Sequence, residues 1–302
     1  MDISELFPAG PIIDETDQIG RRSSIEDLAQ RLRAGDVVRV FDRRRWGKSS
    51  VARAALARLH DQGVIAVRLP LDEYPTAEAA AAVLASHFLS ETQRAASGAR
   101  SLGGRLGGVL AQAGKAAGSE EASALGGLLE GLRPDELTLS QVLTAIPQDL
   151  ARRQRTAAVT IDEAHLIARW RKTDRAALRA FFERNDRRAG VVMASSDQKA
   201  EEKLRKPEVL GYLGEEFPLP AIDVEDWRHG LRRRFRNAGV PIDDDALEFL
   251  LDESKGHPYC TMLLAKKAAE VAGAFEVTTR SVIAVALPTV RKHEAWKLRD
   301  RG

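Results

Sequence analysis

The sequence contains almost no cysteine. Cys260 is the single cysteine among 302 residues, so an internal disulfide cannot form. A lone thiol is typical of proteins in a reducing compartment, and it excludes a zinc site built on a cysteine cluster. The sequence therefore predicts a cytoplasmic protein whose stability comes from an apolar core.

Long apolar runs are missing as well. No stretch of about 18 uncharged apolar residues exists, so no membrane-spanning helix is expected. The first residues, Met1–Gly10, are acidic and contain no apolar run, so the sequence predicts no signal peptide. A membrane partner is accordingly not expected.

Aromatic residues and net charge are both low. Aromatic residues make up 5% of the chain, and 46 Lys and Arg stand against 44 Asp and Glu, giving a net charge of +2. Few aromatics together with frequent alanine favour helices over a β-sandwich. The charge balance excludes a histone-like polycation but is compatible with local basic patches.

Short apolar runs alternate with helical patterns over the first 220 residues. Strands are expected at 37–41, 64–69, 157–161 and 190–195 and near 217. Helices are expected at 24–33, 48–60, 76–92, 139–155 and 173–184. This alternation predicts an α/β core with a parallel sheet and helices on both faces.

After Pro220 the pattern becomes almost entirely helical. We therefore expect a core at 1–220 and an all-helical lid domain at 221–302, with the boundary at Pro218–Pro220. Residues 95–131 are rich in Gly, Ala, Ser and Leu and contain no aromatic residue, which indicates an insertion in the core.

A phosphate-binding loop is predicted between the first strand and the second helix. Gly47, Lys48 and Ser49 match the last three positions of the pattern G-x-x-x-x-G-K-[ST]. Gly47 lets backbone N–H groups turn toward phosphate oxygens, Lys48 supplies a positive charge, and Ser49 offers a hydroxyl to Mg²⁺. The other residues expected to line the phosphates are Arg43, Arg44, Arg45, Trp46 and Ser50.

The first glycine of that pattern is absent. Asp42 occupies its position, and a carboxylate there repels a triphosphate unless it points away or pairs with an arginine of the loop. Asp tolerates left-handed backbone better than most residues, so the turn can still form. Slow hydrolysis and lost nucleotide binding are both open at this point.

Two adjacent carboxylates follow the third predicted strand. Asp162 is expected to hold Mg²⁺ through its water shell, and Glu163 to orient and activate the attacking water. Neighbouring residues at a strand end point in different directions, so the pair can perform two tasks. The alternative is a strand that simply ends in an acidic turn.

Together these segments resemble a known family, the archaeal-type P-loop ATPases, which are relatives of the AAA+ and STAND nucleotide switches. The residues that carry the resemblance are Ile19-Gly20-Arg21-Arg22, Arg43-Arg44, Asp162-Glu163-Ala164-His165, Ser195-Ser196 and Lys255-Gly256-His257-Pro258-Tyr259. The resemblance covers about 12–272. It implies a P-loop NTPase sheet sandwiched by helices and followed by a helical lid.

The resemblance also implies roles for single residues. Ile19, Gly20 and Arg21 are expected against the adenine and ribose, and Ser195 and Ser196 are expected to sense the γ-phosphate. The residues expected to bring the lid against the nucleotide are Gly256, His257 and Pro258. For these last three residues the alternative is a helix stop and restart, since Pro suits the first turn of a helix.

Two basic clusters have three interpretations. Arg169–Arg188 carries eight basic residues against three acidic ones, with Trp170 and Phe181-Phe182 interleaved, and Arg228–Arg236 carries five arginines. The clusters could bind DNA, supply an arginine to a neighbouring subunit's nucleotide, or form solvated helix faces.

The sequence thus predicts an ATPase that binds Mg·ATP and acts as a nucleotide-driven switch or motor on a protein or DNA partner or on a second copy of itself. Lys48 and Glu163 are the expected catalytic residues, and Ser49 and Asp162 the expected metal ligands. The alternatives are a non-hydrolysing scaffold with a vestigial nucleotide site, and a protein that supports DNA remodelling or transposition.

Overall fold

The computed structural model describes residues 2–8, 10, 17–97, 138–184, 186–211, 214–273 and 277–300. Contacts divide the chain into two compact units. The first unit comprises 1–26, 42–54 and 218–302, and the second comprises 27–41 and 55–217. Within the expected insertion, 95–97 belong to a helix and the remainder lies outside the described residues. The division into a core at 1–220 and a lid at 221–302 stays a prediction.

The second unit is built on a five-stranded sheet with the order β2-β3-β4-β1-β5. Its strands are β1 (Val37–Phe41), β2 (Ile65–Pro70), β3 (Ala157–Asp162), β4 (Ala189–Ser195) and β5 (Glu215–Glu216). Every neighbouring pair is parallel. The predicted α/β class is therefore confirmed. Because the strands run in one direction, β1, β3 and β4 all end at the same edge of the sheet.

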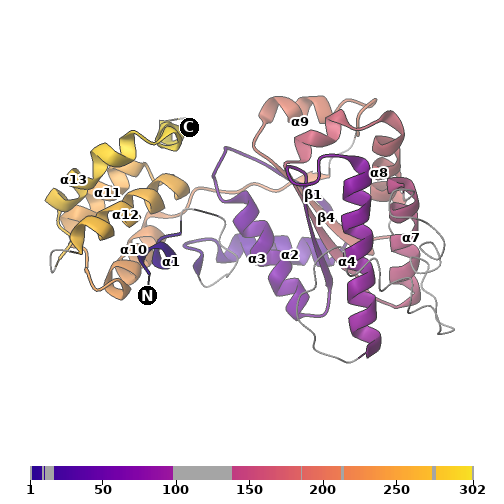
Figure 1. The fold of residues 1–302 in the computed structure, drawn as a ribbon, viewed down its shortest axis with the longest axis horizontal. Helices are drawn as coiled ribbons and strands as arrows, with labels where there is room; N and C mark the ends of the chain where they lie inside the picture. Colours follow the sequence, from indigo (N-terminus) through magenta and orange to yellow (C-terminus); the bar gives the residue numbers. More distant parts are fainter. Residues whose placement is uncertain are drawn as a thin grey trace. The chain divides into compact units, whose positions relative to one another are not determined.

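Helices α4 (Ala77–Ser97), α7 (Leu139–Arg152) and α8 (Lys172–Arg184) cover one face of this sheet (Figure 1). Their apolar side chains and those of β3 line a common, wholly apolar region, to which Leu84, Leu143, Leu178 and Val159 contribute. The strands supply continuous apolar runs to this core, as expected for a sheet buried on both faces.

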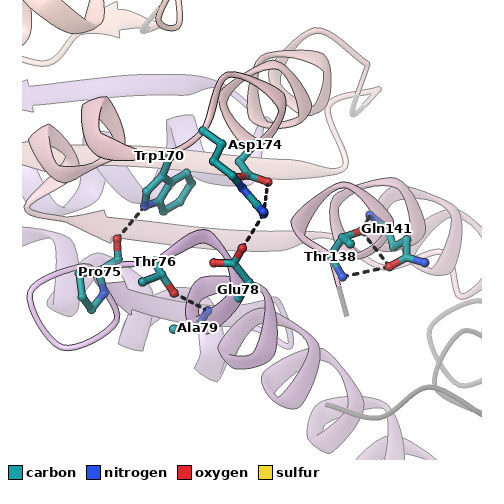
Figure 2. A network of polar contacts seen from close by, with 9 residues as sticks. Pro75, Thr76, Glu78, Ala79, Thr138, Gln141, Trp170 and Asp174 are labelled. Atoms are coloured by element: carbon teal, nitrogen blue, oxygen red, sulfur yellow. Dashed lines mark hydrogen bonds and ion pairs between the residues drawn. The ribbon is translucent and has the colours of Figure 1, made fainter. Parts of the chain in front are cut away.

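A polar network ties the beginnings of these helices together (Figure 2). The indole nitrogen of Trp170 donates to the carbonyl oxygen of Pro75 at 2.8 Å, just before α4 begins. Arg171 bonds both to Asp174 in α8 and to Glu78 in α4. Because these contacts join segments about 95 residues apart, they hold the start of α8 near the start of α4.

Helix α7 has a capping motif where it begins, at its N-terminus, also seen in Figure 2. The hydroxyl of Thr138 accepts from the backbone N–H of Gln141, and the Gln141 side chain accepts from the backbone N–H of Thr138. This reciprocal arrangement is a capping box, and it satisfies two N–H groups that the helix itself leaves unpaired.

The opposite face of the sheet is approached closely by helix α2 (Arg22–Arg33) through its C-terminal half. A Cβ placed on Gly190 in β4 would lie 2.0 Å from the carbonyl oxygen of Leu32. No side chain fits there, so glycine is required for this contact rather than for backbone freedom.

Replacing Gly190 with alanine is therefore expected to lower the free energy of unfolding by about 2 kcal/mol, because α2 must move away from β4. Gly273→Ala is the control: its Cβ would meet nothing nearer than 3.6 Å, and its stability is expected to change by less than about 0.5 kcal/mol. Urea unfolding followed by circular dichroism measures both. Equal midpoints for the two variants would contradict the close approach.

Arg39 lies in the middle of β1 although its neighbours are apolar. Its guanidinium is 9% exposed and bonds to Glu201 of α9 (Gln198–Leu204), to Glu216 of β5 and to the carbonyl oxygen of Gly214. A buried arginine needs such a full set of partners. Through them it joins the short edge strand to the sheet.

The first unit contains five helices among its described residues that carry its apolar core. They are α1 (Ile3–Leu6), α10 (Val224–Asn237), α11 (Asp244–Ser254), α12 (Pro258–Ala272) and α13 (Arg280–Arg291), followed by the 3₁₀ helix η3 (Glu294–Asp300). Phe7 packs against Phe235 with ring centroids 4.9 Å apart. Arg234 is buried and donates to the carbonyl oxygens of Leu6 and Asp17. The N-terminal residues are thus held to the helical segment after 218.

The expected elements are present, with boundaries that differ by a few residues. The helix expected from Lys48 is α3 (Lys48–Asp61). The helix expected at 24–33 is α2, which begins earlier, at Arg22, so that Ser24 lies buried in its first turn. In the part of the chain that the structure describes, no helix is both long enough and apolar enough to cross a membrane.

Candidate functional site

The segment 42–47 forms the loop that joins β1 to α3, and Lys48 is the first residue of that helix. Arg45 and Gly47 have left-handed backbone, with φ of 61° and 97°. Alternation of left-handed and right-handed residues turns successive N–H groups to one side, which makes a concave binding site for anions. The helix N-terminus adds a positive partial charge in the same place.

Several amides of this loop are free to meet an anion. The N–H groups of Arg44, Arg45 and Gly47 have no acceptor within the described part of the chain. A Cβ on Gly47 would meet only the Arg21 guanidinium, at 4.0 Å, so the space beside the loop is open. The backbone therefore fits a bound polyphosphate.

Lys48 folds back over the loop. Its Nζ donates to the carbonyl oxygens of Asp42 at 2.8 Å and Arg43 at 2.6 Å. An ammonium group has three donors, and the residue is 8% exposed. To bind a phosphate, Lys48 would exchange these carbonyl contacts for phosphate contacts. Its ammonium group already lies against the loop.

The carboxylate of Asp42 is engaged inside the loop. Its Oδ1 accepts from the backbone N–H of Arg43 at 2.6 Å and lies 3.9 Å from the Arg43 guanidinium. The backbone of Asp42 is not left-handed. The left-handed residues of the loop are Arg45 and Gly47. Of the two arrangements that would spare a triphosphate, pairing with a loop arginine is the one observed.

The side chains of Arg43 and Arg45 lie against aromatic rings. The Arg43 guanidinium carbon is 4.1 Å from the ring centroid of Trp46, and that of Arg45 is 3.9 Å from the ring centroid of Tyr259. Cation–π contacts of this kind are typical of arginine. Arg44 and Arg45 are both exposed, whereas Arg43 is partly buried.

Trp46 is buried although it lies in the phosphate-binding loop. It is 5% exposed, and its indole N–H donates to the carbonyl oxygen of Leu219 at 2.9 Å. Its ring meets the imidazole of His257 edge-on, with centroids 5.5 Å apart. The predicted phosphate loop is thus packed against the sequence Gly256-His257-Pro258, which the resemblance had placed at the nucleotide.

The segment 254–258 is a helix stop and restart. Lys255 and Gly256 both have left-handed backbone, with φ of 52° and 62°. His257 then caps α12, accepting from the N–H of Cys260, and Pro258 is the first residue of that helix. The structural interpretation of this motif therefore holds, and its role at a nucleotide stays a prediction.

His257 is held as a neutral imidazole. Burial is the main cause that lowers its pKa from the usual 6.5, and the positive charges of Arg43 and Arg45 act in the same direction. Its contact with Trp46 is accordingly between two uncharged rings.

The predicted adenine-side residues are fixed in the same unit. Arg21 donates to the carbonyl oxygens of Trp46, at 3.2 Å, and Pro220, and burial lowers its pKa to about 10 against the opposing effect of Asp42. Gly20 approaches Ile222 so closely that a Cβ would lie 2.6 Å away, and Ile19 faces Gly230. Their contact with a base stays a prediction.

Asp162 and Glu163 end β3 in the second unit. Asp162 is 8% exposed, and its Oδ2 lies 3.8 Å from Nε of Arg68 on the neighbouring strand β2. Glu163 has left-handed backbone, with φ of 52° and ψ of 43°, which costs a residue with a side chain about 1–2 kcal/mol. Strain of this size at a strand end is typical of functional positions.

Ser195 is the last residue of β4, and His165 links it to Glu163. The imidazole Nδ1 of His165 is 3.1 Å from Oε2 of Glu163 and 3.3 Å from Oγ of Ser195. Ser196 is partly exposed. Sequence reasoning assigned no role to His165 or Arg68. The signal for His165 was its place two residues after Glu163, opposite a strand that ends in serine.

The structure therefore gathers the predicted site residues in two groups. Within the first unit it brings together the loop Asp42–Ser50, Arg21 and His257. Within the second it brings together Asp162, Glu163 and Ser195 at the carboxyl edge of the sheet, the edge at which β1 also ends. No group of three or more His, Cys, Asp or Glu within the described ranges is placed to hold a metal.

The basic cluster at Arg169–Arg188 is largely built into the fold. Arg171 pairs with two carboxylates, Arg175 donates to the Ala168 carbonyl oxygen, and Arg179 donates to two carbonyl oxygens. The interleaved aromatics Trp170 and Phe181-Phe182 are buried in the core, so they are not placed to stack on bases. The exposed members are Arg169, Arg171, Lys172, Arg184 and Arg187.

Part of the cluster at Arg228–Arg236 is paired in a similar way. Arg228 pairs with Glu225 and Glu248, and Arg232 pairs with Asp244. Arg234 is buried against the N-terminal residues. Ion pairs of this kind reduce the charge that a surface presents to nucleic acid, so DNA binding through either cluster stays a prediction.

Similar architectures are found among solved structures. The Walker-type ATPase PABY2304 of Pyrococcus abyssi is 18% identical, covers 98% of this chain and 80% of its own, and superimposes with a TM-score of 0.68. The ORC2 protein of Aeropyrum pernix is 18% identical over 94% of this chain and 71% of its own, with a TM-score of 0.61. RuvB of Thermotoga maritima, a Holliday junction branch migration motor, is 14% identical over 94% of this chain and 72% of its own, with a TM-score of 0.50.

No model of a known protein family matches the sequence, and no curated protein matches it. At 14–18% identity the structural likeness shows the fold alone. The chain has the fold of the archaeal P-loop ATPases, with a parallel sheet flanked by helices and a helical C-terminal region.

Proposed function

We propose that the protein is an ATPase that binds Mg·ATP and works as a nucleotide-driven switch or motor. One observation carries the proposal. β1, β3 and β4 end at one sheet edge; the loop 42–47 follows β1 in the chain, the pair Asp162-Glu163 comes at the end of β3, and Ser195 ends β4. In open parallel sheets this edge is where ligands bind.

The residue roles follow from chemistry. The loop amides and Lys48 bind the phosphates, while Ser49 and Asp162 hold Mg²⁺ together with phosphate oxygens and water. Mg²⁺ keeps several waters and is held by one or two protein ligands, so it does not need a preformed cluster of acids. Glu163 orients the attacking water and accepts its proton. Ile19, Gly20 and Arg21 are assigned to the adenine side, and Ser195 to the γ-phosphate.

A second candidate is a non-hydrolysing scaffold, and the contacts inside the loop favour it. The Asp42 carboxylate occupies the Arg43 amide, and Lys48 is bound to loop carbonyl oxygens. Each of these contacts must be exchanged before phosphate binds. If the exchange costs more than the phosphate contributes, the site is vestigial.

Nucleotide binding decides between these two candidates. For a dissociation constant of about 10 µM, 1 mM Mg·ATP adds about 2.7 kcal/mol to the folded state and is expected to raise the melting temperature by about 5 °C. Lys48→Ala is expected to abolish the rise, whereas Lys267→Ala, which removes an exposed lysine paired with Glu270, keeps it. Thermal unfolding of the three proteins with Mg·ATP and Mg·ADP measures this.

The absence of any rise in the parent protein at millimolar Mg·ATP would favour the scaffold. A rise that persists in Lys48→Ala would remove Lys48 from the site.

The partner of the switch is the remaining question. A protein partner, a second copy of the chain and DNA are the candidates, with the exposed members of the Arg169–Arg188 cluster as the DNA-facing residues. DNA binding through them predicts a dissociation constant that rises steeply with salt. Duplex DNA titrations at two salt concentrations measure it, and binding that is absent or insensitive to salt would remove DNA from the list of partners.

A further inference from the structure

The acidic pair and the serine at the sheet edge are joined by a histidine whose role the proposed function leaves open. Left-handed backbone at Glu163 turns the chain into the 3₁₀ helix η2 (Ala164–Arg169). This turn brings His165 back beside the preceding carboxylate, with Nδ1 3.1 Å from Oε2 of Glu163. The contact is therefore built by the same strained turn that aims Glu163.

The same nitrogen also meets β4. Oγ of Ser195 lies 3.3 Å from Nδ1 of His165, and Ser195 is 2% exposed. That hydroxyl already accepts from the backbone N–H of Asp197 at 3.2 Å. With one accepting contact made, the hydroxyl proton of Ser195 remains to be donated.

Nδ1 of His165 thus lies within hydrogen-bond distance of a carboxylate and a hydroxyl. It cannot donate to the carboxylate and accept from the hydroxyl at the same time. A neutral imidazole carries its single N–H on Nδ1 or on Nε2. With the hydrogen on Nδ1, His165 donates to Glu163 and fixes the carboxylate. With the hydrogen on Nε2, Nδ1 accepts from Ser195 and repels the lone pairs of Glu163. The two arrangements place Glu163 differently.

We infer that His165 is a positioning residue that couples Ser195 to Glu163. When a phosphate oxygen accepts the Ser195 hydroxyl, Nδ1 has no donor left, so its own hydrogen goes to Glu163 and holds the catalytic carboxylate. Without a phosphate, Ser195 donates to Nδ1 and Glu163 is released. The inference rests on the proposed function, because it makes readiness for hydrolysis depend on the phosphate at Ser195.

The first test needs no ATPase activity. Long-range ¹H–¹⁵N spectra of the full chain report the tautomer of each of the six histidines, and the His165 signals are those that His165→Asn removes. In the phosphate-free parent the His165 hydrogen is expected on Nε2, and Glu163→Ala, which removes the carboxylate but keeps the Ser195 donor, is expected to leave it there. Ser195→Ala removes the donor, so the hydrogen is expected on Nδ1. The same tautomer in the parent and both variants would overturn the coupling.

The second test uses turnover and two near-isosteric variants. Asparagine places its amide nitrogen where Nδ1 lies, whereas glutamine places it nearer Nε2. His165→Gln is expected to lower kcat about 10-fold or more with KM changed less than about twofold, since only the orientation of Glu163 is lost. His165→Asn is expected to stay within about threefold of the parent.

Equal losses in the asparagine and glutamine variants, or a change in KM instead of kcat, would show a merely structural role and overturn the inference. If the parent protein hydrolyses no ATP, the proposed ATPase function fails, while the tautomer measurement still decides whether His165 links the two strand ends. The two failures are therefore distinguishable.

Discussion

Replacing Glu163 with glutamine is expected to leave Mg·ATP binding intact and to slow hydrolysis about 1,000-fold. The amide has the size of the carboxylate, and its oxygen can still accept from Nδ1 of His165. In the parent protein that nitrogen lies 3.1 Å from Oε2 of Glu163. What the variant loses is the charge that orients water and accepts its proton. Nucleotide affinity is expected to hold or rise, since one negative charge near the phosphates is gone.

Single-turnover hydrolysis and nucleotide titration measure the two effects separately. Glu183→Gln is the matched control, because Glu183 is an exposed acid of the same unit on α8 and its replacement should alter neither value. A Glu163→Gln variant that hydrolyses ATP at the parent rate would show that the base is another group. Loss of binding in that variant would show that Glu163 contributes to the nucleotide site itself.

The sheet could be predicted because buried parallel strands are continuous apolar runs. The stretch Gly190–Ser195 and its equivalents show this pattern, and the helices between them show the helical period. The strand order could not be predicted, since β1 pairs with β4 and β5, which lie far along the chain. The hydrogen-bond partners of Arg39 could not be predicted for a similar reason, because they come from 201–216 and only the fold brings them near.

The candidate site was predictable to the extent that its chemistry is local in sequence. The loop that ends in Gly47 and Lys48 and the pair Asp162-Glu163 are short patterns whose spacing carries their meaning. The coupling through His165 required β3 and β4 to be neighbours with their ends aligned, which the sequence does not state. The pairing of Asp42 with the Arg43 amide was one of two arrangements that the sequence left open.

The burial of Trp46 is the feature of the loop that was hardest to predict from the sequence. Its hydrogen-bond acceptor, the Leu219 carbonyl oxygen, lies 173 residues away, and His257 lies further still. A tryptophan inside a phosphate loop was expected to line the ligand. In the structure its ring is instead buried and packs against His257.

Trp46→Ala is therefore expected to lower the free energy of unfolding of the first unit by about 3–4 kcal/mol, because a large buried ring is lost and a cavity remains. The change also removes the indole donor from Leu219 and the ring beneath the Arg43 guanidinium. Trp46→Phe keeps an aromatic ring and loses the N–H, so about 1 kcal/mol is expected. Urea unfolding followed by circular dichroism gives both values.

The same substitution should weaken nucleotide binding even though the indole is buried and donates to the Leu219 carbonyl oxygen. The anion-binding amides of the loop converge only while Arg45 and Gly47 keep their left-handed backbone, and the indole of the residue between them is anchored by Leu219 and His257. Once that anchor is removed, binding must also supply the entropy of ordering the loop, which costs about 1–2 kcal/mol for each residue fixed. We expect at least about a tenfold loss of affinity for Mg·ATP in Trp46→Ala and a smaller loss in Trp46→Phe. Unchanged affinity in a destabilised Trp46→Ala protein would mean that the loop holds its shape without the packing of its tryptophan.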